Sequence, residues 1–472
     1  MAGAVVGSTR YITPDGRAST DPLALTPQPP RFSLPKLALS LANPAVELDA
    51  VSGCPWLGVE RCRPAVEWPD VPADRAELPD RFRRSVAACL GDSEIVAVAF
   101  SGGLDSLAVL YHCDALCRRE GRQLVAIVDE MLDDQGVPAS ELARSVIEAF
   151  AIDCELHVVE TDPRRLPPPD WSPSGPRQEA LPRAFDALVE RVDTLGAGVL
   201  LTGSGADELL QASPFLTAAQ LRARRWQAAW RYAADEALYG GAVMGLAQLL
   251  AVVAPRLPPR SSFALYLAAH YPDVREAFPG DVVADRYRAY ALQHYRAWLD
   301  RWRERFIGQR GDWVVAAAWD CVFGCDMLEP IGPVPQRSPF LEPDFARYAL
   351  AIPLHERYTP EHRLPYHRYK RLVLSLYPPR LWPLLPEHKH LYRKAIPEYA
   401  IRLLRGRRLW CRELGLVRDL PDEALVANPG VACQLAALEE WIDGAIERGA
   451  GPTDDVEIDP LWQSVTLWGH RP

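Results

Sequence analysis

Apolar residues between Glu94 and Thr202 occur in short continuous runs that alternate with segments of helical spacing. The continuous runs are rich in Val, Ile and Leu and lie at residues 95–100, 124–128, 156–159 and 198–202. Apolar positions with helical spacing are found at residues 104–119, 140–150 and 179–195. Continuous apolar runs are typical of parallel strands that are buried on both faces. The alternation therefore predicts an α/β fold with a doubly wound parallel sheet and right-handed crossovers.

The regions outside this alternation predict the domain organisation. Residues 1–90 are rich in Pro, Gly and Ser, which indicates a small, irregular N-terminal domain or arm. Residues 91–430 form the predicted main domain, in which the sheet occupies 94–210 and a mostly helical part occupies 211–430. Amphipathic segments predict the helices of this part at residues 218–239, 282–307, 313–325, 345–351, 369–377 and 395–404. Residues 431–472 are expected to form a C-terminal tail.

Charge and cysteine content exclude several classes of function. The formal net charge is −10, whereas a protein that mainly binds nucleic acid usually carries a basic surface. We therefore expect no nucleic-acid partner. The ten cysteines include no CxxC pair and show no disulfide spacing. Buried, reduced thiols of a cytoplasmic protein are therefore favoured over a metal site built from cysteine.

The chain also lacks the sequence signals of a membrane or exported protein. Its first residues do not combine a basic segment with a following apolar one, as a signal peptide does. No stretch reaches the roughly 18 uninterrupted apolar residues of a membrane span. These features predict a cytoplasmic protein without a membrane partner.

The first candidate for chemistry is the loop between the strand predicted at 95–100 and the helix that follows it. Gly102 and Gly103 allow a tight turn with bare N–H groups, and Ser101 and Ser106 add hydroxyl donors at a helix N-terminus. This arrangement predicts a cradle for phosphate. The P-loop signature GxxxxGK[ST] is absent. Asp105 would repel phosphate unless a cation lies between them, so we assign it to Mg²⁺.

The loop Ser101-Gly102-Gly103-Leu104-Asp105-Ser106 resembles the pyrophosphate-binding loop of the N-type ATP pyrophosphatases. These enzymes cleave ATP between the α- and β-phosphates and leave AMP on the oxygen that is being activated. The resemblance therefore implies that the chain uses ATP and Mg²⁺ to adenylate a carboxylate.

A second segment, Gly203-Ser204-Gly205-Ala206-Asp207-Glu208, resembles the Gly-x-Gly-x-Asp-Glu motif of asparagine synthetases. The resemblance makes Asp207 the second magnesium carboxylate, facing Asp105 across the strand ends, and adds Gly203 to the ATP-binding residues. A third segment, Arg337-Ser338-Pro339-Phe340-Leu341-Glu342, is similar to the family's Arg-x-Pro-Phe-Leu-Asp stretch. It implies a catalytic role for Arg337.

The same family carries a loop lysine that stabilises charge developing on the α-phosphate. Lys389, in Glu387-His388-Lys389-His390, is the best match, and Lys394 is the alternative. The segment Tyr369-Lys370-Arg371-Leu372 also lies in the family order. Adenine is expected to bind at the end of the second strand, around Val128 and Asp129. The resemblance covers residues 91–405.

Two departures from asparagine synthetases narrow the expected function. Ala2 follows Met1 where those enzymes have a glutamine-hydrolysing cysteine, and fewer than 100 residues precede the ATP loop. We therefore expect the N-terminal region to be a reduced, glutaminase-like remnant. Relatives without glutaminase activity include β-lactam synthetases and the macrolactam synthetases of lasso peptides. The segment from Leu209 to Leu216, followed by an Arg- and Trp-rich helix, resembles the second group.

The group that deprotonates the amine is left open by the sequence. Asparagine synthetases have Glu at the position of Ser204, and β-lactam synthetases have Tyr there with a Glu at the position of Pro335. Neither base is present. The remaining candidates are Glu208, Asp326, Glu329 and a phosphate oxygen of the adenylate.

The leading hypothesis is an AMP- and pyrophosphate-forming amide synthetase that closes the macrolactam of a lasso peptide. A leader-binding protein and a leader protease are the partners that this resemblance implies. The alternatives are a synthetase that makes a small-molecule amide from ammonia or a small amine, and an ATP-binding pseudoenzyme. Substrate contacts are expected from the helical part and from the Pro-rich loop at 163–176.

Overall fold

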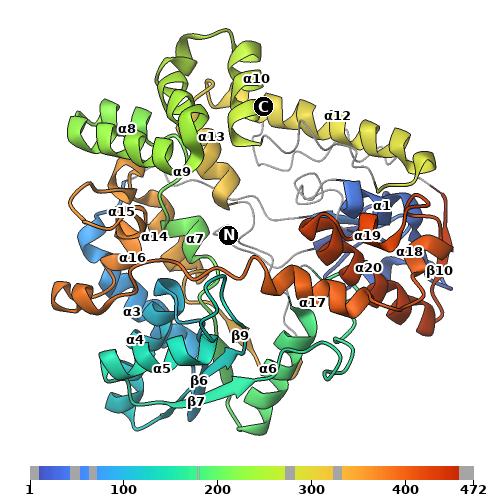
Figure 1. Cartoon of the computed structure of the whole chain (residues 1–472), viewed down its shortest axis with the longest axis horizontal. Coiled ribbons are helices and arrows are strands. Elements are labelled where there is room, and N and C mark those ends of the chain that lie inside the picture. Colours follow the sequence, from blue (N-terminus) through green and yellow to red (C-terminus); the bar gives the residue numbers. More distant parts are fainter. Residues whose placement is uncertain are drawn as a thin grey trace.

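The structure is a computed structural model that describes residues 10–42, 54–62, 72–177, 179, 181–271, 282–322 and 332–455. Its centre is a sheet of parallel strands in the order β7-β6-β5-β8-β9. These strands are β5 (Ile95–Ala99), β6 (Gln123–Asp129), β7 (Glu155–Val159), β8 (Val199–Leu201) and β9 (Gln336–Arg337). Helices cover both faces (Figure 1). The predicted doubly wound α/β fold is confirmed.

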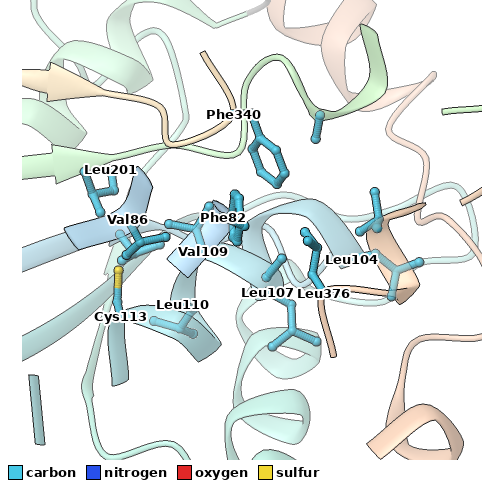
Figure 2. Close-up of a cluster of buried hydrophobic side chains, with 14 of the residues drawn as sticks. Phe82, Val86, Leu104, Leu107, Val109, Leu110, Cys113, Leu201, Phe340 and Leu376 are labelled. Atoms are coloured by element: carbon cyan, nitrogen blue, oxygen red, sulfur yellow. The ribbon is translucent and has the colours of Figure 1, made fainter. Parts of the chain in front are cut away.

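The sheet buries a separate apolar cluster on each face. On one face, side chains of β5 and β8 pack on helices α3 (Leu78–Leu90), α4 (Leu104–Glu120) and α5 (Ala139–Phe150). Figure 2 shows this cluster, with Phe82 and Val86 beside the side chains of α4. On the other face, Ala97 and Leu200 pack on α6 (Pro182–Thr194). Alternating residues of one strand thus serve opposite layers.

Two boundaries at the sheet differ from the prediction. Strand β9 was not predicted, because Gln336 and Arg337 form no apolar run. The strand is held by two backbone hydrogen bonds from β8 and the residue after it. The Leu200 N–H donates to the Pro335 carbonyl (2.9 Å), and the Thr202 N–H donates to the Arg337 carbonyl (3.0 Å). Helix α3 belongs to the sheet core, although it falls within the region 1–90 assigned to an N-terminal domain. Its apolar positions Leu78, Phe82 and Val86 recur every four residues and are fully buried.

The helical part follows β8 and packs as a second layer above the sheet (Figure 1). Its helices are α7 (Ala206–Leu210), α8 (Thr217–Arg222), α9 (Trp226–Val253), α10 (Pro259–His270), α12 (Asp285–Gly308), α13 (Trp313–Val322), α14 (Pro343–Ala351), α15 (Pro365–Tyr369), α16 (Arg371–Leu374) and α17 (Ala395–Leu404). Single turns of 3₁₀ helix lie at η1 (Pro22–Leu25), η2 (Arg75–Glu77), η3 (Ala254–Arg256), η4 (Leu354–Arg357) and η5 (Pro379–Leu384). Two predicted helices are each divided. The one expected at 218–239 breaks at Arg224, which has φ of 58°, and the one at 369–377 breaks at Lys370.

One described helix is long and apolar enough to cross a membrane, namely α9 with the turn that follows it, Trp226–Arg256. Length and composition alone are weak support for a span, because the core helices of many proteins share them. The prediction from sequence counted uninterrupted apolar runs, and Asp235 and Glu236 interrupt this one. Both side chains point inward: Asp235 pairs with Arg368 (2.7 Å), and Glu236 accepts a hydrogen bond from Tyr369.

The two ends of the chain form one assembly, which we call the terminal unit (residues 10–42, 54–62 and 400–455). Strand β3 (Arg31–Ser33) pairs in parallel with β10 (Gly451–Thr453). The other elements are the antiparallel strands β1 (Arg10–Ile12), β2 (Ala18–Ser19) and β4 (Glu60–Cys62), with helices α1 (Leu34–Ala42), α18 (Trp410–Glu413), α19 (Asp422–Leu425) and α20 (Pro429–Glu447).

The described part of residues 431–472 is therefore more than the expected tail. Asn428 caps α20, because its side chain accepts hydrogen bonds from the Gly430 and Val431 N–H groups. Leu435, Leu438 and Ile442 of α20 have helical spacing and are completely buried against α1 and α17. Residues 456–472 lie outside the described part of the chain.

The Pro-rich loop after β7 joins the terminal unit to the sheet. The Trp171 indole donates a hydrogen bond to the Trp441 carbonyl (3.0 Å), and the Trp441 indole donates to the Ser172 carbonyl (2.8 Å). The Trp56 indole donates to the Pro173 carbonyl (2.6 Å). The middle of this loop, which was expected to contact substrate, is thus used for packing.

Candidate active site

The loop after β5 is already shaped to receive an anion. Gly102 has φ of 76°, and a Cβ there would lie 2.7 Å from the Leu142 side chain, so the turn requires glycine. The Ser106 hydroxyl donates to the Gly103 carbonyl (3.3 Å) and lies 3.2 Å from the Ser101 hydroxyl. Helix α4 begins at Leu104, directly after Gly103, so its N-terminus faces the loop. The predicted glycine turn at the start of α4 is therefore present, and phosphate binding by it stays a prediction.

The second motif lies against the first because of a glycine. A Cβ on Gly203 would lie 3.0 Å from the Ser106 backbone nitrogen, so only glycine lets the two loops approach this closely. Gly205 has φ of 87° and begins α7, which carries Asp207 in its first turn. Strands β5 and β8 are direct neighbours. Both loops therefore leave the carboxyl edge of the sheet side by side, which is where α/β sheets bind ligands.

The structure brings Asp105 and Asp207 together around one buried lysine. The Lys370 ammonium donates to both carboxylate oxygens of Asp105 (2.8 and 2.7 Å) and also to Asp207. The side chain of Lys370 is only 2% exposed. Lys389 reaches the other oxygen of Asp207 (3.1 Å) from the solvent side and is 54% exposed. Two carboxylates thus face two ammonium groups at the strand ends.

The pKa shifts in this cluster follow the number of lysine contacts. Burial raises the pKa of Asp105, and the single contact to Lys370 does not offset it. Burial also acts to raise the pKa of Asp207, but Lys370 and Lys389 together hold it below its usual value. Burial acts to lower the pKa of Lys370, yet the two aspartates raise it, so Lys370 stays protonated.

The donor set fits a magnesium ion that arrives with a nucleotide. No group of three or more His, Cys, Asp or Glu side chains suited to a metal ion occurs in the described part of the chain. Mg²⁺ commonly takes only one or two protein carboxylates and completes its shell with phosphate oxygens and water. Asp105 and Asp207 supply that number of carboxylates at the phosphate cradle. These residues therefore fit Mg²⁺ bound together with ATP.

The segment that carries Lys389 is fixed to the loop after β6. His390 pairs with the buried Asp133 carboxylate (2.7 Å), and the Asp134 N–H donates to the Leu391 carbonyl (2.8 Å). Hydrogen bonds to His390 and to the Val137 N–H are the main reasons for the lowered pKa of Asp133. Lys394, the alternative lysine, is exposed and reaches Asp134 only through its backbone N–H. The geometry thus places Lys389, and not Lys394, at the paired carboxylates.

Arg337 is not brought into this cluster. Its guanidinium donates to the carbonyls of Ala88 (3.3 Å) and Cys89 (3.5 Å) at the end of α3. Unpaired carbonyls at a helix C-terminus attract a cation. Within the described residues, no contact joins Arg337 to Asp105 or Asp207. Its observed role is therefore to fix β9 to α3.

The residues expected near adenine lie at the end of β6, beside the phosphate loop. The Val128 side chain is buried, so only its backbone could meet a ligand. One carboxylate oxygen of Asp129 is buried without a hydrogen-bond partner. Burial alone raises the pKa of Asp129 to about 6. A buried acceptor without a donor suits a ligand group that supplies one.

Among the side chains that are candidates for the base, Glu208 is the one that lies within the described residues. Asp326 and Glu329 lie outside the described residues. Burial, followed by the charge of Asp207, raises the pKa of Glu208. The Ser204 hydroxyl instead accepts a hydrogen bond from Thr202 (3.2 Å), and Pro335 takes part in strand pairing. Glu208 is thus the described carboxyl beside the metal-site aspartates whose pKa is shifted toward that of a useful base.

Lys370 is the site residue for which no role was predicted from the sequence. The segment containing it was identified, but a lysine between Tyr369 and Arg371 gives no sign of pointing inward. Its position depends on the break between α15 and α16, where Lys370 has φ of −100° and ψ of 25°. A continuous helix was predicted there, so the direction of the side chain could not be derived.

Comparison with known protein families gives a match that includes most residues of this site. The family model described as asparagine synthase matches residues 77–374, well over half of the chain. The match includes Asp105, Asp207 and Lys370, whereas Lys389 and the whole terminal unit lie outside it. No curated protein matches the chain.

Proposed function

The chain belongs to the asparagine synthase family, and from this premise we propose that it is an AMP- and pyrophosphate-forming amide synthetase. Family membership supports ATP-dependent amide-bond formation in general terms. The observation that carries the more specific proposal is the convergence of Asp105 and Asp207 on the glycine-lined phosphate cradle. Carboxylates at that position are useful when pyrophosphate must be held with its metal and released.

In this proposal the cradle of Ser101 to Ser106 holds the β- and γ-phosphates of ATP. Asp105 and Asp207 hold Mg²⁺, which supplies positive charge to the phosphates when it is bound. Lys370 holds both aspartates in place and opposes the effect of burial on their pKa values. Lys389, which approaches from the solvent side, stabilises the charge that develops at the α-phosphate.

The reaction proceeds in two transfers. An oxygen of the substrate carboxylate forms a bond to the α-phosphorus, and the bond from that phosphorus to pyrophosphate breaks. The amine then forms a bond to the acyl carbon, and AMP leaves with the electron pair of the broken C–O bond. Glu208 accepts the proton that the amine loses, since its raised pKa makes it a stronger base than an ordinary glutamate.

The substrate that we propose is a peptide that carries both reacting groups, as in lasso-peptide macrolactam formation. The resemblance of the segment Leu209 to Leu216 supports this choice. That segment links Asp207 to α8, and it is fixed by hydrogen bonds from Tyr232 to the Ser213 carbonyl (3.0 Å) and from the Ala212 N–H to the Tyr369 carbonyl (3.0 Å). A tethered amine gains rate from proximity and requires no separate ammonia source. A leader-binding protein and a leader protease belong to the same proposal.

The test is product analysis with purified protein, ATP and Mg²⁺. The proposal expects AMP and pyrophosphate in equal amounts with a leader-free precursor peptide, together with the loss of one water from the peptide mass. Release of ADP and phosphate would contradict adenylation. Amide formation with ammonia and a small carboxylate, but not with the peptide, would favour the small-molecule alternative. No nucleotide turnover with either class would favour the pseudoenzyme.

A variant separates the two transfers. Glu208→Gln is expected to retain exchange of labelled pyrophosphate into ATP while slowing amide formation by roughly 10²-fold or more, since general-base catalysis contributes about that much. Loss of both activities in parallel would instead assign Glu208 to binding or to folding.

A further inference from the structure

The outer face of α9 exposes a long apolar surface. Leu238 is 80% exposed and Trp230 is 78% exposed, which is unusual for such large side chains. The other members of this surface, which we call the α9 face, are Trp226, Tyr239, Val243, Leu246, Leu249 and Val253, with Leu265 from α10. In Figure 1, α8, α9 and α10 lie at the top of the view, away from the strands. Large apolar side chains exposed in this number on one helix and its neighbour are typical of a site of interaction.

Exposed arginines flank the α9 face at both ends; among them, Arg222 pairs with Asp312 and Arg231 with Asp235. Arg222, Arg224 and Arg231 are exposed at its N-terminal end, and Arg256 and Arg260 are exposed at its C-terminal end. The acidic residues between positions 221 and 271 are Asp235 and Glu236, and both turn inward. This cationic rim occurs in a chain whose net charge is −10. The arginines are therefore concentrated around the α9 face, although the chain as a whole is acidic.

A second copy of the chain fits this face poorly. In a twofold dimer the two α9 helices would lie either parallel or antiparallel, because each copy uses the same surface. Both ends of the helix carry arginines, so either arrangement places arginine opposite arginine. Within the α9 face no exposed acidic residue is available to compensate for this repulsion.

A membrane-spanning role for α9 also fits poorly. Its inner face buries Tyr232, Ala247, Gln248 and Ala251, and Asp235 is paired with Arg368. Withdrawal of the helix would strand these polar groups in hydrocarbon at a large cost. In addition, Gly241 has non-helical φ and ψ of 74° and −175°, which divides α9 near its middle. The helix is thus fixed to the protein by one side and free on the other.

We propose that the α9 face docks the protein onto an anionic lipid surface, with the helix lying in the plane of the membrane. The aliphatic side chains enter the boundary between head groups and acyl chains, Trp226 and Trp230 lie at head-group level, and the arginines meet lipid phosphates. The geometry provides this arrangement without any change in fold. It departs from the expectation of no membrane partner, which rested on the absence of a spanning run.

Vesicle flotation tests the proposal with the full-length protein. Unilamellar vesicles of phosphatidylglycerol and phosphatidylcholine in equal amounts are expected to carry the protein to the top of a gradient, and vesicles of phosphatidylcholine alone are expected to carry much less. Leu246→Glu should lower the bound fraction at least roughly tenfold, because a carboxylate would enter the apolar layer. Leu292→Glu on α12, also at an exposed leucine, is the matched control and should bind as the wild type does.

The double variant Arg256→Glu, Arg260→Glu separates the electrostatic contribution. It should reduce binding to anionic vesicles by more than roughly tenfold and change binding to phosphatidylcholine little. Circular dichroism and thermal melting of each variant check that the fold is kept. The absence of flotation for the wild type, or equal flotation of Leu246→Glu, would overturn the proposal. A wild-type dimer that Leu246→Glu dissociates, without vesicle binding, would overturn it in favour of a second copy.

Discussion

The carboxyl end of the sheet and the terminal unit are stabilised by opposite kinds of contact. At the sheet end, Asp105, Asp207, Lys370 and Lys389 balance one another in charge, and two glycine-dependent loops position them. In the terminal unit, aromatic and aliphatic side chains form most of the core, and Trp441 contacts the rings of Phe32, Trp56 and Trp171; the buried charges of Lys36 and Glu60 form an ion pair there (2.7 Å). The asparagine synthase match covers Asp105, Asp207 and Lys370 of the first region and none of the terminal unit.

The difference separates chemistry from scaffolding in this chain. Burying charged groups close together costs desolvation energy, so such groups are expected where they bind ligands or take part in catalysis. An apolar core mainly provides stability. The loop after β7 connects the two regions, since Trp171 leaves the sheet and packs into the terminal unit. Changes at the paired charges of the sheet end should therefore alter turnover more than stability, and changes in the terminal unit should do the reverse.

The largest effect is expected from Asp105→Asn. The change keeps the size of the side chain but removes a carboxylate from the proposed magnesium site. We expect pyrophosphate formation to fall by roughly 10³-fold or more, and the thermal midpoint to change only modestly, because burial already disfavours the Asp105 carboxylate and Lys370 keeps its contact with Asp207. Single-turnover release of labelled pyrophosphate measures the effect.

Asp114→Asn is the matched control for that variant. Asp114 lies on the same helix, α4, and its ion pair with Arg118 is at the surface (2.8 Å). Both activity and stability should stay close to those of the wild type. Retention of activity in Asp105→Asn would remove the carboxylate from the mechanism and break the proposed division between the regions.

The reverse effect is expected for Trp441→Ala in the terminal unit. Trp441 is 3% exposed, and its indole donates to the Ser172 carbonyl. Removal of a buried tryptophan leaves a cavity and costs about 3–5 kcal/mol of stability. Urea unfolding measures the loss, with Trp226→Ala at a 67% exposed position as the control. A Trp441→Ala protein that is stable but loses catalytic activity would show that the terminal unit takes part in catalysis.

The sequence predicted the sheet end much better than the terminal unit, and the reason is physical. Buried strands and glycine-bounded turns are local patterns, so Asp105 and Asp207 could be placed at strand ends without knowledge of the fold. The pairing of β3 with β10 joins residues more than 400 positions apart and leaves no local trace. Lys370 was missed for a related reason, since a short break in a helix decides where its side chain points.

An intermediate effect is expected for Lys389→Ala. Its ammonium is exposed and contacts Asp207 alone within the described cluster, so its loss should leave the fold intact. If it stabilises the developing charge at the α-phosphate, kcat should fall by about 10²- to 10³-fold. Lys394→Ala is the matched control and should be nearly normal. An equal loss in both variants would point to general attraction of ATP by this segment.

The smallest effect, and the one that best tests the comparison, concerns Asp129. Its pKa is about 6 in the folded protein because of burial, against a value near 3.8 for an unburied aspartate. Between those pH values the unfolded chain releases the proton first, so stability falls as pH rises through this window and stays lower above it. Asp129→Asn removes that penalty. The variant should be more stable at pH 7 by about 1–3 kcal/mol and unchanged near pH 3.

A gain in stability from Asp129→Asn would have a consequence for function. The buried oxygen without a donor is then a group kept for a ligand at the expense of stability, and the KM for ATP should rise while the stability improves. Urea unfolding at the two pH values and initial rates at varied ATP measure both effects. A variant that is less stable at pH 7 would show that the Asp129 carboxylate has a stabilising role of its own. Asp129 would then not be an example of a sheet-end residue that lowers stability in favour of function, and the contrast with the terminal unit would not hold there.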